Sequence, residues 1–114
     1  MHEVSICESI MDIIRAEAAK ERASKVNSVR LKIGELAGVV EDSMRFAFEV
    51  VTKGTVAEGA RLVIDNVPLT AHCKSCNRTF HIVGYAFSCA HCESPEIEVV
   101  SGRELQVEDI DLEV

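Results

Sequence analysis

Two short stretches, Cys73-Lys74-Ser75-Cys76 and Cys89-Ala90-His91-Cys92, decide how the middle of this chain folds. Each is a C-x-x-C knuckle, and residues 77–88 separate the two. This spacing lets two turns close on one tetrahedral ion. Four thiolates fill the coordination sphere and leave no position for water or substrate. The pattern therefore predicts a structural Zn(II) site with the ligands Cys73, Cys76, Cys89 and Cys92.

Two other readings of these cysteines remain open at the level of sequence. An iron centre with four thiolate ligands uses similar spacings, so sequence alone does not separate iron from zinc. Disulfides suit small secreted proteins, but we see no charged and then apolar leader at the N-terminus, and Cys7 would be left unpaired. Zinc in a reducing cytoplasm is the reading that we expect to hold.

The composition excludes several classes of function. The chain has 114 residues and a formal net charge of -7, which disfavours binding to nucleic acid, because that requires clustered Lys and Arg. Aromatic residues make up only 4% of the chain and offer little for base stacking. No apolar run approaches the roughly 20 residues of a membrane span, so we expect no membrane association.

Two segments show the spacing of amphipathic helices. From Val4 to about Arg22, apolar residues recur on one face, and Ser5 to Glu8 can form a capping box. Cys7 falls on the apolar stripe and is expected to be a small core residue. A second helix is predicted over Ser43–Lys53, with Gly54 as its C-cap.

Several other segments alternate as strands do. These are 27–36, 61–67, a short stretch at 79–83 between the knuckles, 97–100 and 103–114. The simplest arrangement places the late strands beside the two early ones. We also expect Phe80, Tyr85 and Phe87 to cover one side of the metal site.

Together these elements predict an α+β fold. Two helices would pack on a small mixed β-sheet, and a zinc-ribbon-like module would be inserted between its strands. The predicted domains are residues 1–69 with 98–114, and a zinc-binding domain at 70–97. The inserted segment is too short to bury a core of its own and must fold around its ion.

The first residues, Met1-His2-Glu3, are a second candidate metal site. A free terminal amine followed by histidine can chelate through the amine, the deprotonated His2 amide and the His2 imidazole. This nearly planar nitrogen set suits Ni(II) or Cu(II) better than zinc. The fourth donor stays open: it could be the Glu3 amide, the Glu3 carboxylate or another group.

With both sites in view, the chain resembles the HypA/HybF family of hydrogenase nickel-incorporation proteins over essentially its whole length. The resemblance is carried by Met1-His2-Glu3, by Lys32-Ile33-Gly34-Glu35-Leu36, by residues 54–59 and by the paired knuckles in order. The family often has proline where this chain has Ala90, but the thiolate spacing is intact.

The resemblance implies a nickel metallochaperone, which agrees with the cytoplasmic location expected above. It implies Ni(II) as cargo at Met1, His2 and Glu3, and zinc at the four knuckle cysteines. The implied partners are a HypB-type GTPase and the large subunit of [NiFe]-hydrogenase, with urease served by some relatives, and the protein would be a monomer or homodimer. His72, His81 and His91 are expected at the surface or in support of the ligands, where exchange with a cysteine is a further option.

The first alternative is a zinc-ribbon adaptor that binds protein or nucleic acid and never carries nickel. The second is an enzyme or electron carrier that uses the site with four thiolates. An enzyme is disfavoured, since we find no Ser/His/Asp arrangement, no phosphate-binding glycine loop and no open metal position.

Overall fold

The computed structural model describes residues 2–114, whose backbone forms two compact units. The first contains the chain up to Lys32, together with Val39–Asp65 and Gln106–Val114. The second contains Ile33–Gly38 and Asn66–Leu105, and the predicted zinc-binding domain at 70–97 lies inside it. Met1, one of the predicted nickel ligands, lies outside the described residues. Within the described part of the chain, no helix has the length and apolar character needed to cross a membrane.

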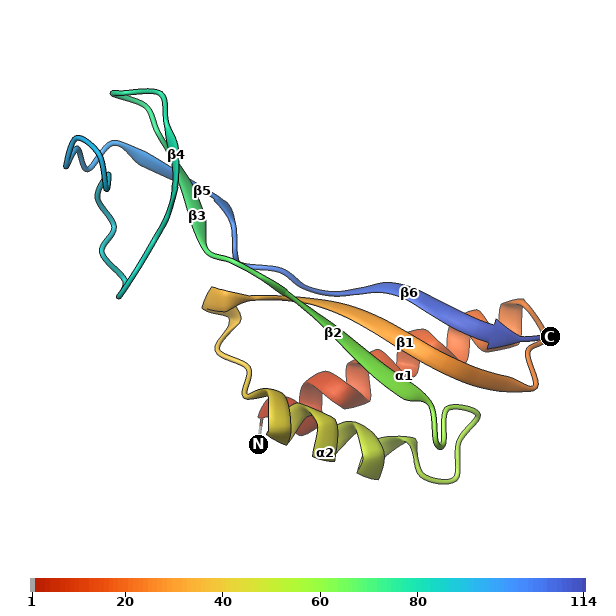
Figure 1. The fold of residues 1–114 in the computed structure, drawn as a ribbon. Helices are drawn as coiled ribbons and strands as arrows, with labels where there is room; N and C mark the ends of the chain where they lie inside the picture. The colour runs from red at the N-terminus through yellow and green to blue at the C-terminus, as the bar shows by residue number, and fades with distance from the viewer. Residues whose placement is uncertain (1) are drawn as a thin grey trace. The chain divides into compact units, whose positions relative to one another are not determined.

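The first unit contains two helices, α1 (His2–Lys20) and α2 (Glu41–Thr52). Figure 1 shows both on the same face of the sheet. Apolar residues recur in each helix at helical spacing, which gives each one buried stripe toward the sheet and the other helix. The buried residues are Cys7, Ile10, Met11, Ile14 and Ala18 in α1, and Met44, Ala47, Phe48 and Thr52 in α2.

Cys7 belongs to this helical core. Its sulfur lies 3.6 Å from the Met44 carbonyl oxygen and 3.7 Å from the Met44 sulfur. Burial raises the pKa of Cys7 to about 11, so the thiol stays protonated and behaves as a small apolar group. The expectation that Cys7 is a core residue is confirmed.

The sheet of the first unit has the strand order β2-β1-β6. Its strands are β1 (Lys25–Gly34), β2 (Arg61–Val67) and β6 (Leu105–Glu113). In Figure 1, β1 and β2 run in the same direction and β6 runs in the opposite one, so the sheet is mixed. Arg30 on β1 ties the three strands together, because its guanidinium lies 3.1 Å from Asp65 of β2 and 3.5 Å from Asp109 of β6.

The second unit has its own antiparallel sheet, in the order β4-β3-β5. Its strands are β3 (Thr70–Cys73), β4 (Thr79–His81) and β5 (Ile97–Ser101). Ala71 on the central strand is opposite Phe80 on one side and Val99 on the other. The buried core around it is small and consists of Leu69, Ala71, Cys73, Phe80, Ile82 and Cys89.

A short 3-10 turn, η1 (Glu35–Ala37), completes the second unit. The Glu35 carboxylate accepts the Leu69 backbone N–H at 2.9 Å and lies 2.9 Å from the His81 ring nitrogen Nε2. The pKa of Glu35 lies below its ordinary value, mainly because of the hydrogen bond from the Leu69 N–H and next because of the hydrogen bond with His81. The Leu36 N–H donates to the Gly102 carbonyl at 2.8 Å. Residues 33–38 are therefore held to the chain on both sides of the knuckles.

Several boundaries differ from the sequence expectation. Helix α1 begins at His2 and not at Val4, so the capping box at Ser5 is wrong. The negative charge of Glu3 in the first turn favours this earlier start. Strand β1 ends at Gly34, where Glu35 turns away to accept the Leu69 N–H.

The placement of the late strands was half correct. Strand β6 lies beside β1 as expected, but β5 pairs with β3, with Ile97 opposite Cys73. The first knuckle begins at the last residue of β3, and the Lys74 N–H donates to the Glu96 carbonyl at 2.9 Å. These contacts hold residues 96 and 97 to the end of β3, a strand of four residues that was too short to be predicted from its alternation.

We expect Gly34→Ala to destabilise the protein by about 3 kcal/mol, because a β-carbon at this site overlaps the Gly102 carbonyl oxygen and the backbone must shift. Gly38→Ala is the matched control. It has open space but a φ of 71°, so it should cost only about 1 kcal/mol. Urea unfolding measures the free energy of unfolding of both variants. Equal losses of this free energy would contradict the close approach of the backbone at Gly34.

We also expect Glu35 to contribute to the acid sensitivity of the fold. Its pKa is lowered in the folded state, so the stability it contributes is present above the ordinary value of 4.5 and is lost as pH falls through the lower folded value. Glu35→Gln should therefore be less stable near neutrality and should lose less stability on acidification. Denaturant titrations at a series of pH values test this, with Glu93→Gln as the control. Parallel pH profiles for wild type and Glu35→Gln would rule it out.

Candidate metal centre

The first knuckle is a tight turn closed by backbone hydrogen bonds. The Cys73 N–H donates to the Arg78 carbonyl at 2.8 Å, and the Asn77 N–H donates to the Cys73 carbonyl at 2.9 Å. Asn77 has a φ of 66°, a left-handed conformation that asparagine adopts more readily than most residues. The turn therefore reverses the chain directly after Cys76.

The second knuckle repeats this pattern residue by residue. The Cys89 N–H donates to the Ser94 carbonyl at 2.8 Å, and the Glu93 N–H donates to the Cys89 carbonyl at 2.9 Å. Glu93, like Asn77, is left-handed, with a φ of 64°. The hydroxyl oxygens of Ser75 and Ser94 lie 2.8 Å apart and join the two turns. Two copies of one local structure thus face each other.

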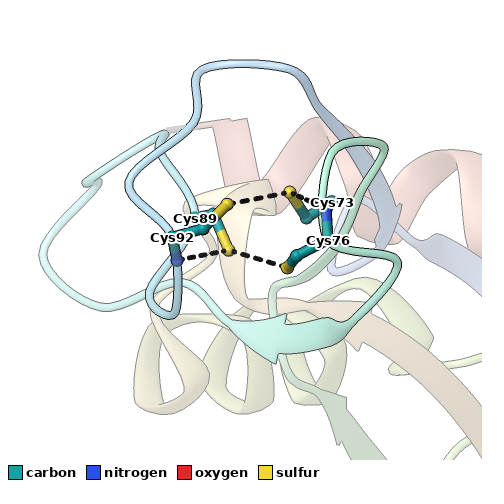
Figure 2. A group of neighbouring side chains, drawn as sticks. All are labelled: Cys73, Cys76, Cys89 and Cys92. Atoms are coloured by element: carbon teal, nitrogen blue, oxygen red, sulfur yellow. Dashed lines mark hydrogen bonds between the residues drawn. The ribbon is translucent and has the colours of Figure 1, made fainter.

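Figure 2 shows the four cysteine side chains converging between the two knuckles. Their sulfur atoms all lie within 4.8 Å of one another. Cys73 Sγ is 3.6 Å from Cys92 Sγ, and Cys76 Sγ is 3.6 Å from Cys89 Sγ. A tetrahedron of sulfurs with Zn–S bonds of about 2.3 Å has edges of about 3.8 Å. The donor set and its spacing therefore fit a zinc site with four thiolates.

Backbone amides support negative charge on two of these sulfurs. The Cys76 N–H donates to Cys73 Sγ at 3.4 Å, and this bond lowers the pKa of Cys73. Burial raises the pKa of Cys89, but the N–H groups of Cys92 and His91 donate to its sulfur at 3.3 Å and bring the pKa down to about 6. Amide donors of this kind favour thiolate, the form that binds metal.

The cluster is closed on one side and open on the other. Cys73 and Cys89 are buried, Cys76 is half-buried and Cys92 is exposed. The expected aromatic cover is only partly present. Phe80 is buried and makes an edge contact with His91, at a ring distance of 6.4 Å. Tyr85 and Phe87 are 70% and 45% exposed, so the expectation that they cover the site is wrong.

The three histidines of the second unit have other partners. His72 lies 2.9 Å from the Asn77 side-chain oxygen, His81 pairs with Glu35, and the His91 ring contacts Phe80. Each ring is thus engaged beside the cluster and not in it. The group identified as able to hold a metal within residues 2–114 contains only the four cysteines.

The N-terminal candidate residues lie in the first turn of α1. The His2 side chain is 57% exposed, and its Nδ1 is 3.5 Å from the Glu3 carboxylate, whose side chain is only 13% exposed. The Val40 N–H donates to this carboxylate at 3.4 Å. The pKa of Glu3 is lowered most by a hydrogen bond from its own backbone N–H, and next by the hydrogen bond from the Val40 N–H. Because Val40 is the N-cap of α2, Glu3 fixes the start of α1 beside the start of α2.

Sequence reasoning missed two supporting residues. Glu35 was recognised only as part of a family-like stretch, although its carboxylate joins η1 to β4. Val40 acts through its backbone N–H, which a side-chain motif does not reveal. The position of Glu35, an acidic residue directly after a glycine that ends a strand, could have indicated its role. Nothing in the sequence indicated the role of Val40.

Comparison with known families gives a match along nearly the whole chain. The family model described as "Hydrogenase/urease nickel incorporation, metallochaperone, hypA" matches residues 1–112. The chain is 43% identical over 113 residues to the hydrogenase maturation factor HypA of Geobacter metallireducens. It is 41% identical over 113 residues to that of Alkalilimnicola ehrlichii. Both alignments cover 99% of this chain and 100% of the relative.

Solved structures give a similar fold. The solution structure of the Ni metallochaperone HypA from Helicobacter pylori has a TM-score of 0.68 at 24% identity, covering 98% of this chain and 97% of that chain. A second solution structure, of HypA protein, has a TM-score of 0.73 at 25% identity, covering 98% and 96%. These matches agree with the fold described above, which has two helices, one mixed sheet and one antiparallel sheet.

We expect Cys89→Ser to abolish stoichiometric zinc binding and to unfold the second unit, because the binding energy of a structural metal is folding energy. The measurement is zinc content by a thiol-release colour assay, with circular dichroism to follow the helices, which should persist. Cys7→Ala is the matched control and should keep its zinc. A Cys89→Ser protein that retained full zinc, or wild-type protein with the visible absorption of an iron centre, would contradict the assignment.

Proposed function

The chain belongs to the HypA family of nickel metallochaperones for hydrogenase maturation, and from this premise we propose that it binds Ni(II) at its own N-terminus and delivers the ion to a maturing enzyme. The nickel ligands are Met1, His2 and Glu3, and zinc is held by Cys73, Cys76, Cys89 and Cys92. Nickel is cargo, whereas zinc maintains the shape of the second unit.

The observation that carries this proposal is the position of His2. It is the first residue of α1, and its imidazole is largely exposed. The first N–H groups of a helix have no acceptor within the helix, so deprotonating the His2 amide breaks no helical hydrogen bond. The terminal amine, this amide and the imidazole then supply three nitrogens in adjoining chelate rings, a set that suits Ni(II).

Glu3 compensates an electrostatic cost of this location. A cation at a helix N-terminus meets the positive end of the helix dipole. The Glu3 carboxylate lies 3.5 Å from the His2 ring and is held in place by the Val40 N–H. A fixed negative charge beside the imidazole therefore lowers the cost of bringing Ni(II) there, whether or not Glu3 is itself a ligand.

Exposure of the site suits transfer of the ion. A partner can approach His2 from solvent and replace the ligands one at a time, which a buried cage would prevent. The recipients that we propose are a HypB-type GTPase and the large subunit of [NiFe]-hydrogenase in the cytoplasm, with urease as a further recipient. The protein would act as a monomer or homodimer.

His2→Ala should abolish nickel binding without loss of zinc or helix content. Removing an outer-shell partner of a metal typically costs about 10–100-fold in affinity, so loss of a ligand should weaken binding by more than about 100-fold. Calorimetric titration of untagged protein with Ni(II) measures this. His72→Ala, which removes an imidazole of the second unit, is the matched control and should bind nickel as wild type does.

Acetylating the terminal amine separates the proposal from a zinc-ribbon adaptor that carries no nickel. The modification removes one donor and should suppress nickel uptake as strongly as His2→Ala does. If unmodified and acetylated proteins bind Ni(II) equally, the N-terminal site is wrong and the adaptor function is favoured.

A further inference from the structure

The loop between the two knuckles carries large apolar side chains that this chain does not bury. Within residues 83–87, which we call the apolar loop, Val83, Tyr85 and Phe87 are 71%, 70% and 45% exposed. The segment 79–88 includes no Asp, Glu, Lys or Arg, although these four types make up 27% of the chain. Exposed apolar side chains gathered on such an uncharged segment are typical of an interaction surface.

Both ends of the apolar loop are fixed to the core of the second unit. Ile82, directly before it, is buried, and its N–H donates to the Leu69 carbonyl at 2.9 Å. Cys89, shortly after it, is also buried, and its N–H donates to the Ser94 carbonyl at 2.8 Å. In Figure 1 the chain after β4 runs away from the strands of this sheet and turns back before β5. The loop thus presents its side chains from a fixed base, which lowers the entropy cost of binding.

The tip of the apolar loop is a tight turn with an unusual residue. The Ala86 N–H donates to the Val83 carbonyl at 3.2 Å. The two residues between them, Gly84 and Tyr85, are left-handed, with φ of 62° and 59°. Such a turn favours Gly, Asn and Asp, whereas tyrosine is disfavoured because its β-carbon crowds the backbone. The turn therefore places an aromatic ring in solvent at a cost in folding free energy, and local strain of this kind clusters where proteins bind ligands and partners.

Charge decides which class of partner fits the apolar loop. Segments that lie on membranes combine aromatic side chains with Lys and Arg, because cytoplasmic membrane surfaces are anionic. The loop has no basic residue and the chain has a net charge of -7, so neither a membrane nor a nucleic acid is complementary to it. An apolar pocket of another protein is complementary, because burying the loop there leaves no charged group without a partner.

The proposed function indicates which protein offers such a pocket. A recipient that takes up nickel after its synthesis must keep its metal site open to the donor. An open interior exposes apolar surface that the finished enzyme buries, as in any protein that has not completed its folding. A GTPase partner needs no such opening to bind. The nickel-free enzyme is therefore the partner whose chemistry matches the loop.

We propose that the apolar loop docks on the nickel-free large subunit of the target hydrogenase, with the Tyr85 ring as the anchor in an apolar pocket of that subunit. The identity of this recipient rests on the proposed function, whereas the shape of the loop does not. The second unit then has a task besides holding zinc. Because the loop starts and ends beside the knuckles, bound zinc would also keep the docking surface in shape.

Tyr85→Asn tests the anchor. Asparagine adopts the left-handed conformation more readily than tyrosine, so the turn should persist and the free energy of unfolding in urea should not fall. In interferometry with immobilised nickel-free large subunit, this variant should raise the dissociation constant by about thirtyfold, the effect of losing an interface hot spot. Tyr85→Phe keeps the ring and should bind as wild type does. Ile13→Ala, which removes an exposed apolar side chain of α1, is the control and should also bind as wild type does.

The outcomes separate docking from nickel binding. Tyr85→Asn should bind Ni(II) as wild type does, and His2→Ala should still bind the large subunit. Equal binding of that subunit by wild type and Tyr85→Asn, or no binding by wild type, would overturn the docking proposal and leave the nickel site untouched. A His2→Ala variant that kept its nickel would overturn the nickel site alone. Wild type that bound the mature, nickel-containing enzyme as tightly, or that sedimented with phosphatidylglycerol vesicles through Tyr85, would also refute docking on an open recipient.

Discussion

The convergence of four sulfur atoms from two matching knuckles is the interaction on which the second unit depends. That unit has a buried core of only six residues, and two of these, Cys73 and Cys89, are themselves predicted metal ligands. So little apolar burial does not outweigh the loss of chain entropy. When bound, zinc would cross-link the two knuckles and supply the missing stability. The same backbone pattern follows each knuckle, with Asn77 and Glu93 left-handed, so the chain turns back in the same way after each pair of cysteines.

The proposed nickel site follows the opposite physical logic. It lies at the start of a helix whose packing is complete without any ion, since α1 is held by the apolar stripe from Cys7 to Ala18. Helix N-terminal amides without internal acceptors and an exposed imidazole make a site that can be filled and emptied without unfolding anything. An ion that shapes the fold must stay, whereas an ion that is delivered must leave, and under our proposal the chain uses different donors for the two tasks.

Much of the fold could be predicted from sequence because its signals are local. The helical stripes of α1 and α2, the alternation of 61–67 and the knuckle spacing each depend on residues close together in the chain. The sequence did not reveal pairings that depend on distant contacts. The four-residue strand β3, the pairing of β5 with it and the bond from Glu35 to the Leu69 N–H arise only after the knuckles have brought these segments together.

The cysteine cluster could be predicted from sequence for the same reason, whereas the nickel ligands stay a prediction. Side chains such as the four cysteines and His2 are visible in the sequence, and the cysteines meet as their spacing indicates. Backbone donors are not visible, so the role of Val40 in holding Glu3 could not be foreseen. Exposure of Tyr85 and Phe87 also escaped prediction, because it depends on where the loop between the knuckles turns.

The central claim is that zinc shapes the fold and nickel is carried. X-ray absorption spectroscopy of untagged protein loaded with both metals tests it most directly. At the zinc edge, the account predicts four sulfur neighbours at about 2.3 Å. At the nickel edge, it predicts nitrogen and oxygen neighbours with no sulfur. Sulfur in the nickel shell, or a zinc shell dominated by nitrogen, would contradict the claim that one ion shapes the fold and the other is carried.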